Sequence, residues 1–388
     1  MAEVRFDFVV IGGGPAGATV SLQLARAGYS VCLVERRTFP REILCGEFLS
    51  HEVVGIIRGL GIESEFLSLG PARITKFTLS PDRGPTFSEL LGFAGYGMKR
   101  GAFDQLLLNA AAGNGVKVLQ PAEAEEVLRS ADSFEIRCRL NGEPLILRSR
   151  WCIGAYGKAS QLDKRLGRQC AGVRTQMNGI KFHVPSEVLV GVDEHEIQIF
   201  AGPGMYCGVN HVGNGFATIC FLERRSGDDV PPRGRLRALM TANRHFADVM
   251  GGSAIVAVES AQVYGTGNIF FGTRNLVENG IFMIGDAGRV ISPLAGDGIS
   301  MAMQSAHLLG RLFLEARSST PDEENLEAEY RRRWGLMFNA RIRAAAALQR
   351  IVLSTPLRRF GVALLSLSPS LLRSAISLTR GPSSNQPD

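Results

Sequence analysis

The feature that most constrains the fold lies near the start of the chain, where a short apolar segment runs directly into a glycine-rich turn. Residues 5–11 are mostly apolar and rich in β-branched and aromatic side chains, which predicts a buried parallel strand. The next six residues read Gly-Gly-Gly-Pro-Ala-Gly and fit G-x-G-x-x-G, and a helical pattern then continues to Ala27 and ends at Gly28. This order predicts a dinucleotide-binding strand–turn–helix with the phosphates at the amino end of the helix.

The residues of this turn each have an expected role. Gly12 permits the tight turn, Gly14 lets the backbone approach a pyrophosphate, and Gly17 lets the helix pack closely on the strand. The expected cofactor contacts from the turn are Gly12, Gly14, Pro15, Ala16 and Gly17.

The second strand expected, at residues 29–34, ends at an acidic residue. The carboxylate of Glu35 is placed to accept hydrogen bonds from the ribose hydroxyls of the adenosine half. An acid here disfavours a 2′-phosphate, so NADP is not expected at this site. Arg36 follows directly and is counted among the expected contacts.

A second glycine-rich segment follows another apolar strand, at residues 281–284. The strand ends in Gly-Asp, which gives a carboxylate beside backbone that a ligand can approach closely. A helix expected from about 299 to 313 would aim its positive dipole at whatever binds above it. An ordinary strand–loop–helix is the alternative, but it leaves the glycines and the proline of the loop unexplained. The expected contacts are Gly285, Asp286, Pro293, Gly296, Gly298 and Ile299.

With these motifs in place, the chain resembles a known family. Residues 6–47, 95–108, 151–160 and 281–311 are similar, in order, to geranylgeranyl reductases and para-hydroxybenzoate-hydroxylase-like flavoproteins, of which flavin-dependent halogenases are a related branch. The resemblance implies FAD bound in an extended form, with its ring near residues 45–47 and 293–298. In such a site, the Asp286 carboxylate suits the hydroxyl-rich ribityl chain, and the dipole of the helix after Gly298 would stabilise the anionic reduced flavin.

The same resemblance suggests roles for residues between the two motifs. Residues 39–41 and 45–50 look like the segment that lies beside the flavin ring in the reductase branch, which makes Arg41, Cys45 and Gly46 cofactor contacts. Arg100 looks like the flavin-contacting arginine of the family. Cys45 and Glu47 are the catalytic candidates, with the Cys45 thiol as a proton donor; a buried small hydrophobic residue is the alternative role for Cys45.

Two departures from the family limit what it implies. Tyr156 stands where the hydroxylases carry an aspartate that helps to hold the pyrophosphate and NAD(P)H, so direct reduction in the hydroxylase manner is in doubt. The halogenase motif W-x-W-x-I-P is absent, and the two tryptophans are Trp151 and Trp334. Halogenation is therefore not expected.

The pattern changes to short alternating strands between residues 176 and 274, which predicts an antiparallel sheet. The expected fold class is α/β, with a doubly wound, Rossmann-like FAD domain of the glutathione-reductase type, an inserted antiparallel β-sheet substrate domain and C-terminal helices. The substrate-facing candidates on the sheet are His183, Tyr206, His211 and Tyr264. The expected parts are an FAD-binding domain (1–70, 95–175 and 275–315), a substrate domain (71–94 and 176–274), a helical region (320–380) and a disordered tail (381–388).

The basic charge is concentrated at the end of the chain. The formal net charge is +6, whereas residues 331–388 hold ten Arg, no Lys and one Asp. Nucleic acid is therefore not an expected partner. A packed helical cap, an anionic membrane surface and the docking of a carrier or electron-donor protein remain open for this region. The arginines that lie among its leucines are Arg350, Arg358, Arg359, Arg373 and Arg380.

The remaining features exclude several classes of protein. The seven cysteines lack zinc spacing, so no metal is expected, and they are expected to be reduced in a cytoplasmic protein. The start of the chain lacks a signal-peptide pattern, and no uncharged apolar stretch reaches membrane-spanning length. Peripheral contact with a membrane stays open.

Three functions remain for an FAD enzyme of this kind. A monooxygenase that hydroxylates or epoxidises a small apolar or aromatic substrate is favoured, by analogy within the fold. A reductase of isoprenoid C=C bonds is the alternative, supported by the Cys-Gly-Glu run at residues 45–47 and the apolar tail. A flavoprotein that modifies a partner or a carrier-bound substrate is the third. The electron donor is either NAD(P)H or a separate reductase.

Overall fold

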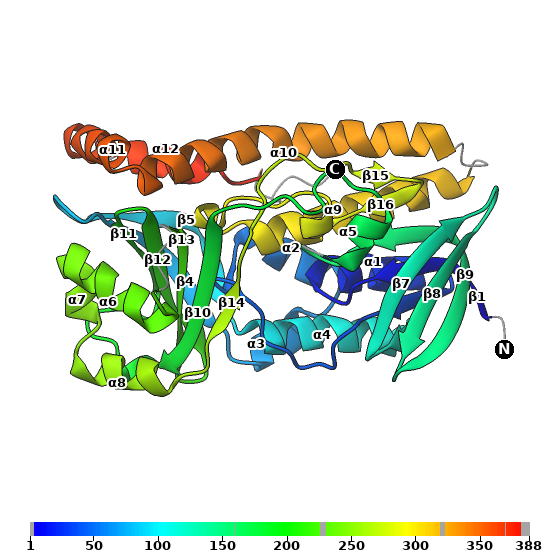
Figure 1. Cartoon of the computed structure of the whole chain (residues 1–388), viewed down its shortest axis with the longest axis horizontal. Coiled ribbons are helices and arrows are strands. Elements are labelled where there is room, and N and C mark those ends of the chain that lie inside the picture. Colours follow the sequence, from blue (N-terminus) through cyan, green and yellow to red (C-terminus); the bar gives the residue numbers. More distant parts are fainter. Residues whose placement is uncertain (1–3, 159, 226–229, 319–322, 369, 382–388) are drawn as a thin grey trace.

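The computed structural model describes residues 4–158, 160–225, 230–318, 323–368 and 370–381, and its strands form two eight-stranded sheets (Figure 1). The first sheet has the order β15-β16-β9-β1-β2-β6, with β8 pairing β9 and β7 pairing β8. Its strands are β1 (Val4–Ile11), β2 (Val31–Val34), β6 (Lys117–Leu119), β7 (Ala122–Arg129), β8 (Phe134–Leu140), β9 (Glu143–Gly154), β15 (Val277–Glu278) and β16 (Ile281–Met283).

Five strands of this sheet run parallel, from β16 through β9, β1 and β2 to β6. The apolar runs of β1, β2, β9 and β16 end in buried residues, as helices on the faces of a parallel sheet require, whereas β6 at the edge is only half-buried. Because the strands are parallel, their carboxyl ends meet at one edge of the sheet, which is where ligands bind in α/β folds. The helices of this half are α1 (Pro15–Arg26), α2 (His51–Gly59), α3 (Glu63–Ser68), α4 (Arg100–Gly113), α5 (Gln161–Arg165) and α9 (Gly298–Glu315).

The second sheet has the order β14-β10-β13-β12-β11-β4-β5-β3. It contains the strand pair expected near residues 72–80 and 86–93, and Asn214 turns the β12–β13 hairpin with a φ of 52°. Its strands are β3 (Phe48–Leu49), β4 (Ala72–Ser80), β5 (Phe87–Gly97), β10 (Met177–Pro185), β11 (Glu196–Gly202), β12 (Met205–Gly213), β13 (Phe216–Arg224) and β14 (Tyr264–Thr266).

This sheet differs from the expected one in three details. β4 and β11 pair in parallel, so the expectation of a wholly antiparallel sheet was wrong at this pair. No hairpin joins these strands, so nothing local in the sequence fixes their relative direction. In addition, β3 lies in a segment assigned to the FAD domain, and β5 continues to Gly97, past the expected boundary at residue 94.

Helices also cover one face of the second sheet, where the alternating pattern predicts only strands. Their buried side chains, among them Leu239 and Phe246, form one cluster with Phe182 and Phe221 of the sheet. Figure 1 shows them on the side of this sheet away from the first sheet. These helices are α6 (Pro232–Ala242), α7 (Arg244–Val249) and α8 (Gly252–Ser260).

The C-terminal helices lie across both halves of the molecule. Figure 1 shows α10 (Glu323–Leu353) running from the first sheet toward the second, where α11 (Thr355–Leu367) and α12 (Ser370–Leu378) follow. All three lie within residues 320–380, the region expected to be helical. No helix in the described ranges is both long and apolar enough to cross a bilayer. Of the tail expected to be disordered, residues 382–388 lie outside the described residues.

A buried hydrogen bond fixes α10 to the first sheet. Tyr330 is fully buried, and its hydroxyl donates to the carbonyl oxygen of Met283, at 2.9 Å. We expect Tyr330→Phe to lower the free energy of unfolding by about 1–2 kcal/mol, because it leaves a buried carbonyl without this donor. The measurement is urea unfolding followed by circular dichroism.

The matched control is Tyr29→Phe, because the Tyr29 hydroxyl has no hydrogen-bond partner in the described part of the chain. The control should unfold at nearly the same urea concentration as the unaltered protein. Equal losses in the two variants would contradict a specific role for the Tyr330 hydroxyl.

Candidate functional site

The first glycine-rich turn is tightly packed on one side and open on the other. A Cβ atom on Gly12, whose φ is +112°, would lie 2.4 Å from the carbonyl oxygen of Ala155, and one on Gly17 would lie 1.8 Å from the carbonyl oxygen of Gly12. A Cβ atom on Gly14 would meet only Nη2 of Arg41, at 3.7 Å. The turn is therefore closed where the helix packs on the strand and open at Gly14, where a phosphate would approach.

Glu35 and Arg41 border the open side of this turn. The Glu35 carboxylate accepts hydrogen bonds from the backbone N–H groups of Gly13 and Arg37, each at 2.8 Å. The Arg41 guanidinium lies 3.8 Å from Glu35, and its Nε has no hydrogen-bond partner among the described groups. An acid held at the turn and a cation with spare donors suit a ribose and a pyrophosphate. Arg36 is exposed beside them.

The second glycine-rich segment adjoins the first. A Cβ atom on Gly285 would lie 3.1 Å from the Cβ of Ala16, so α1 and the loop after β16 meet with no space for a side chain between them. Asp286 follows and is half-buried. A Cβ atom on Gly298 would meet nothing within 4 Å. The loop is thus close-packed against the first turn and open where α9 begins.

The two helices that begin at this edge both have free amino ends. Neither Gly14, before α1, nor Asp297, before α9, caps its helix with a side chain. Uncapped N–H groups and the positive end of the helix dipole attract anionic groups. Open glycines, free helix ends and the Arg41 guanidinium together fit the diphosphate and ring of FAD. A role for Asp286 at the ribityl chain stays a prediction.

A buried cluster of charged groups lies where the first sheet meets the second. Glu47 is fully buried and has a φ of 59°, which is unusual for a residue with a side chain. Its Oε1 accepts hydrogen bonds from the backbone N–H of Arg100 (2.9 Å) and from Nζ of Lys181 (2.7 Å). Its Oε2 lies 2.6 Å from Nε2 of His183. One carboxylate therefore joins the loop of residues 42–47, the start of α4 and strand β10.

These contacts keep the cluster charged. Burial alone would raise the pKa of Glu47, but the hydrogen bond to His183 and the charge of Lys181 outweigh it and lower this pKa to about 2. Burial would lower the pKa of Lys181, but Glu47 and Glu42 raise it above its ordinary value. Ligand atoms of Glu42, Glu47 and His183 lie within 4.8 Å of one another, as in a metal site. The Lys181 ammonium, however, already contacts both carboxylates, at 2.8 and 2.7 Å.

The thiol of Cys45 borders this cluster. Cys45 is half-buried, and its Sγ accepts a hydrogen bond from the backbone N–H of Glu47, at 3.3 Å. Arg100 is buried and forms two hydrogen bonds with Asp104, at 2.7 and 2.8 Å. Burial would lower the pKa of Arg100, but Asp104 and the nearby Cys45 raise it. The Arg100 guanidinium, paired with Asp104, thus lies beside the Cys45 sulfur.

The four substrate-facing candidates separate into two pairs. His183 contacts Glu47, and the Tyr264 ring lies 5.1 Å from Nζ of Lys181 and 6.0 Å from the His183 ring. Tyr206, in contrast, is buried in an apolar cluster with Leu222 and Val290. The ring of His211 is 3.2 Å from the carbonyl oxygen of Val192. The structure therefore brings His183 and Tyr264, but not the other pair, to the cluster around Glu47.

Two residues of this region escaped the sequence prediction. Lys181 lies two residues before His183, on the same face of β10, and a lysine at an inward position of a strand was a signal of a buried partner. The other is Arg380, which closes on the loop before α9. Its guanidinium lies 3.8 Å from the Asp297 carboxylate and over the rings of Phe48 and Phe93. No local pattern places a C-terminal arginine there.

Tyr156, which replaces the hydroxylase aspartate, belongs to a different network. Its hydroxyl donates to the Asp163 carboxylate (3.0 Å) and accepts from Arg168 (2.9 Å). Burial raises the pKa of Tyr156, so its hydroxyl stays protonated. The position therefore offers a neutral, occupied hydroxyl in place of a carboxylate.

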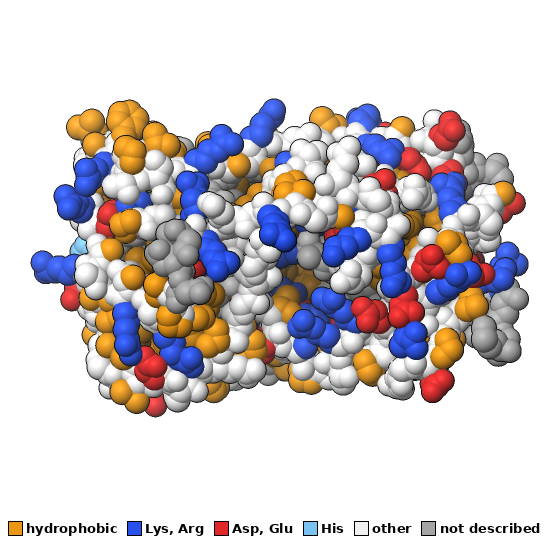
Figure 2. All heavy atoms as spheres, viewed as in Figure 1, with side chains coloured by type: hydrophobic (Ala, Val, Ile, Leu, Met, Phe, Trp, Pro, Cys, Tyr) orange, Lys and Arg blue, Asp and Glu red, His pale blue; other side chains and the backbone are white. Residues whose placement is uncertain are grey.

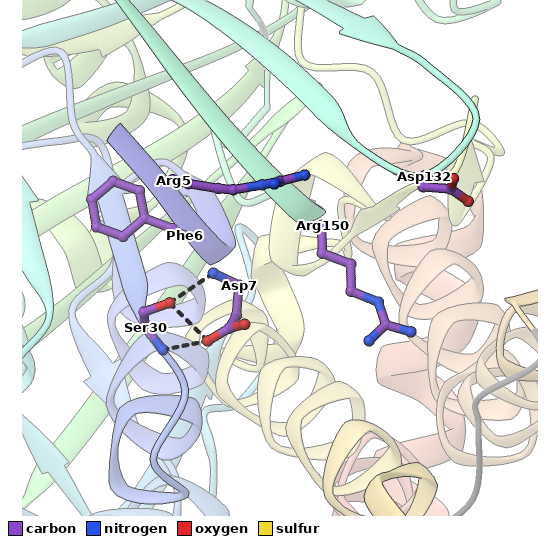
Figure 3. A pocket seen from close by; sticks show the side chains of 6 residues that line it. All are labelled: Arg5, Phe6, Asp7, Ser30, Asp132 and Arg150. Carbon is purple, nitrogen blue, oxygen red and sulfur yellow. Dashed lines mark hydrogen bonds between the residues drawn. The ribbon is translucent and has the colours of Figure 1, made fainter. Parts of the chain in front are cut away.

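A surface hollow of about 610 Å³ lies far from these groups (Figure 3). It is lined by Arg5, Phe6, Asp7, Ser30, Asp132 and Arg150. Figure 3 shows Asp7 and Ser30 hydrogen-bonded to each other. The hollow is at the amino end of β1, opposite the edge where parallel sheets bind ligands. It is therefore not the candidate active site.

Because Gly14 faces open space, a side chain added there should affect FAD binding without affecting folding. We expect Gly14→Val to fold, because its side chain would enter open space, but to purify without the yellow colour of FAD, because that space is where we expect the pyrophosphate to bind. Gly17→Val is the matched comparison and should fail to fold, because its side chain would overlap the Gly12 carbonyl. Circular dichroism and the flavin absorbance of the purified proteins give both readouts. A fully yellow Gly14→Val protein would remove this turn from the FAD site.

Because Glu47 is ionised in the folded protein, the free energy of unfolding should fall as the pH is lowered through the acid range. The folded-state pKa is about 2, below the ordinary 4.5, so the ionised carboxylate stabilises the fold above about pH 4.5 and this contribution declines as the pH falls toward 2. We expect Glu47→Gln to cost about 3 kcal/mol near neutral pH, because it leaves the Lys181 charge partly uncompensated. The difference from the unaltered protein should shrink below about pH 4.5 in urea unfolding.

Glu63→Gln is the control, because Glu63 forms an ion pair with Arg58 at the protein surface. It should change the unfolding free energy little at any pH. A cost for Glu47→Gln that stays constant down to acid pH would contradict a buried, ionised Glu47.

With this geometry described, comparison with known proteins gives the family. The chain matches the family model described as FAD binding domain over residues 5–336. Digeranylgeranylglycerophospholipid reductase 1 of Methanococcoides burtonii is 27% identical over 346 residues, which cover 85% of this chain and 79% of that protein. The flavin-dependent brominase Bmp2 superimposes with a TM-score of 0.76 at 18% identity, over 97% of this chain and 93% of the brominase.

A further solved structure supports the same fold. A geranylgeranyl bacteriochlorophyll reductase-like protein of Thermoplasma acidophilum superimposes with a TM-score of 0.72 at 19% identity, over 97% of this chain and 100% of that one. The family match includes both glycine-rich segments and most of the chain. The resemblance and the α/β fold class predicted from the sequence are therefore confirmed. The chain belongs to the FAD binding domain family, and it is an FAD-dependent oxidoreductase related to the geranylgeranyl reductases.

Proposed function

We propose that the enzyme reduces C=C bonds of an apolar isoprenoid chain. The observation that carries this proposal is the half-buried Cys45 thiol, which lies against the charged cluster of Glu47, Lys181 and His183. Addition of hydrogen across an isolated double bond needs a proton donor beside the source of hydride. The Cys45 thiol carries a proton that it could transfer in this step.

The relatives support the same substrate class. The reductase of Methanococcoides burtonii is named for digeranylgeranylglycerophospholipid, a lipid with geranylgeranyl chains, and the Thermoplasma acidophilum structure is named for geranylgeranyl reduction. The monooxygenase favoured by fold analogy has no comparable support from the site, because Tyr156 gives a neutral hydroxyl where the hydroxylases use a carboxylate. We therefore propose the C=C reductase, which the sequence offered as the alternative, in preference to the monooxygenase.

The proposed reaction consumes a hydride and a proton, and an external electron donor, either NAD(P)H or a separate reductase, must reduce the FAD again after each turnover. Reduced FAD, when bound, supplies a hydride to one carbon of the double bond. The Cys45 thiol gives its proton to the other carbon, and the Arg100 charge and the Glu47 N–H stabilise the thiolate that remains. The thiolate then takes a proton from solvent. Glu47, held ionised by Lys181 and His183, fixes the loop that positions the sulfur.

The function predicts that substrate, and not oxygen, oxidises the reduced enzyme. We expect protein reduced with dithionite under argon to regain oxidised-flavin absorbance when a geranylgeranyl lipid is added, with a product two hydrogens heavier by mass spectrometry. Cys45→Ser should retain FAD and slow this step by about 10²-fold or more, as for loss of a general acid. Cys170→Ser is the matched control, because Cys170 is also a half-buried free thiol.

Two results would count against the proposal. A reduced enzyme that substrate reoxidises only in air, with an oxygenated product, would indicate the monooxygenase. If the Cys45→Ser protein is reoxidised by substrate at an unchanged rate but has lower thermal stability, Cys45 serves only to pack the protein interior.

A further inference from the structure

The helices α11 and α12 carry their large apolar side chains on the outside of the molecule. Leu367 is 83% exposed, Phe360 65% and Leu378 64%. Figure 2 shows hydrophobic side chains gathered at the corner where Figure 1 places α11. We call this surface the outer face; it consists of Leu357, Phe360, Leu364, Leu367, Leu371 and Leu378.

Contacts on the opposite side of α11 fix this orientation. Arg358 is buried and forms two hydrogen bonds with Asp82, each at 2.8 Å. One turn later, Val362 lies against Gly84, where a Cβ atom would be 2.9 Å from the valine Cγ1. Both partners belong to the turn between β4 and β5. The helix is therefore held on one side by Arg358 and Val362, and Leu357, Leu364 and Leu367 are exposed.

The charged residues within the segment that carries the outer face are all of one sign. Residues 354–381 hold four Arg and no Lys, Asp or Glu. Arg358 and Arg380 are paired inside the protein, with Asp82 and Asp297, so these two tail arginines do not face outward. Arg359 is exposed, and the Arg373 side chain is 73% exposed although it pairs with Glu89.

We propose that the outer face docks the enzyme on a bilayer that contains anionic phospholipid. An exposed apolar stripe bordered by arginine is the pattern of a helix that lies in a membrane interface. A second copy of the chain fits this surface less well, because a symmetric contact would bring the arginines of both copies together, and the nearby acids Asp82 and Glu89 already pair with Arg358 and Arg373. Lipid phosphates supply the missing negative charge.

The proposal is tested with the full-length, FAD-loaded enzyme by flotation with vesicles. We expect binding to vesicles that contain phosphatidylglycerol to be about tenfold or more tighter than to phosphatidylcholine alone, and to weaken at high salt. Phe360→Glu with Leu367→Glu should abolish binding while flavin content and dithionite-driven turnover of a detergent-dispersed substrate stay unchanged. Val256→Glu on α8 is the matched control, because Val256 is 70% exposed and lies outside the C-terminal helices; it should bind normally.

The other outcomes each overturn the proposal. No binding to anionic vesicles at low salt would exclude the membrane. Equal loss in the Val256→Glu control would mean that binding is not specific to the outer face. A dimer in light scattering that the double substitution converts to a monomer would assign this face to a second copy. None of these results bears on C=C reduction, which the detergent assay measures separately.

Discussion

The ion pair between Glu47 and Lys181 is the interaction on which the site depends. Glu47 comes from the loop that follows the first FAD motif, and Lys181 comes from the second sheet. Both side chains are fully buried, so neither charge has solvent to compensate it. Separating the two halves here would leave each charge without a partner in a low-dielectric environment, which is costly. The pair therefore fixes the position of β10 relative to the loop that carries Cys45.

The strained backbone at Glu47 has the same explanation. A residue with a side chain is rarely found at a φ near 60°, and the surrounding contacts must compensate for it. The carboxylate gains three partners in this conformation, from Arg100, Lys181 and His183. The adjacent backbone N–H then points to the Cys45 sulfur. The same backbone conformation of Glu47 thus allows its carboxylate to pair with Lys181 and its N–H to hold the Cys45 sulfur.

The C-terminal helices connect the two halves a second time. Tyr330 attaches α10 to the first sheet, and Arg358 attaches α11 to the turn between β4 and β5. Arg380 then returns to the loop before α9, beside the buried Asp297. Burial raises the pKa of Asp297 to about 6, although Arg341 and Arg380 oppose the shift. The C-terminal segment thus places the Arg380 charge at the amino end of α9, where the FAD site is expected, in addition to packing over both halves of the molecule.

The sequence alone determined the parts of the site that are local. The G-x-G-x-x-G turn, the acid at Glu35 and the Gly-Asp after β16 each depend on residues close together in the chain, and their spacing follows from the strand–turn–helix that forms them. The short strands and the three C-terminal helices were also predictable, because their periodicities are local. Tertiary structure decided the rest. Glu47 and Lys181 are 134 residues apart, and Arg358 and Asp82 are 276 apart, so no sequence pattern joins them. The direction of β4 beside β11, the separation of His183 from His211, and the outward leucines of α11 all follow from which surfaces pack together.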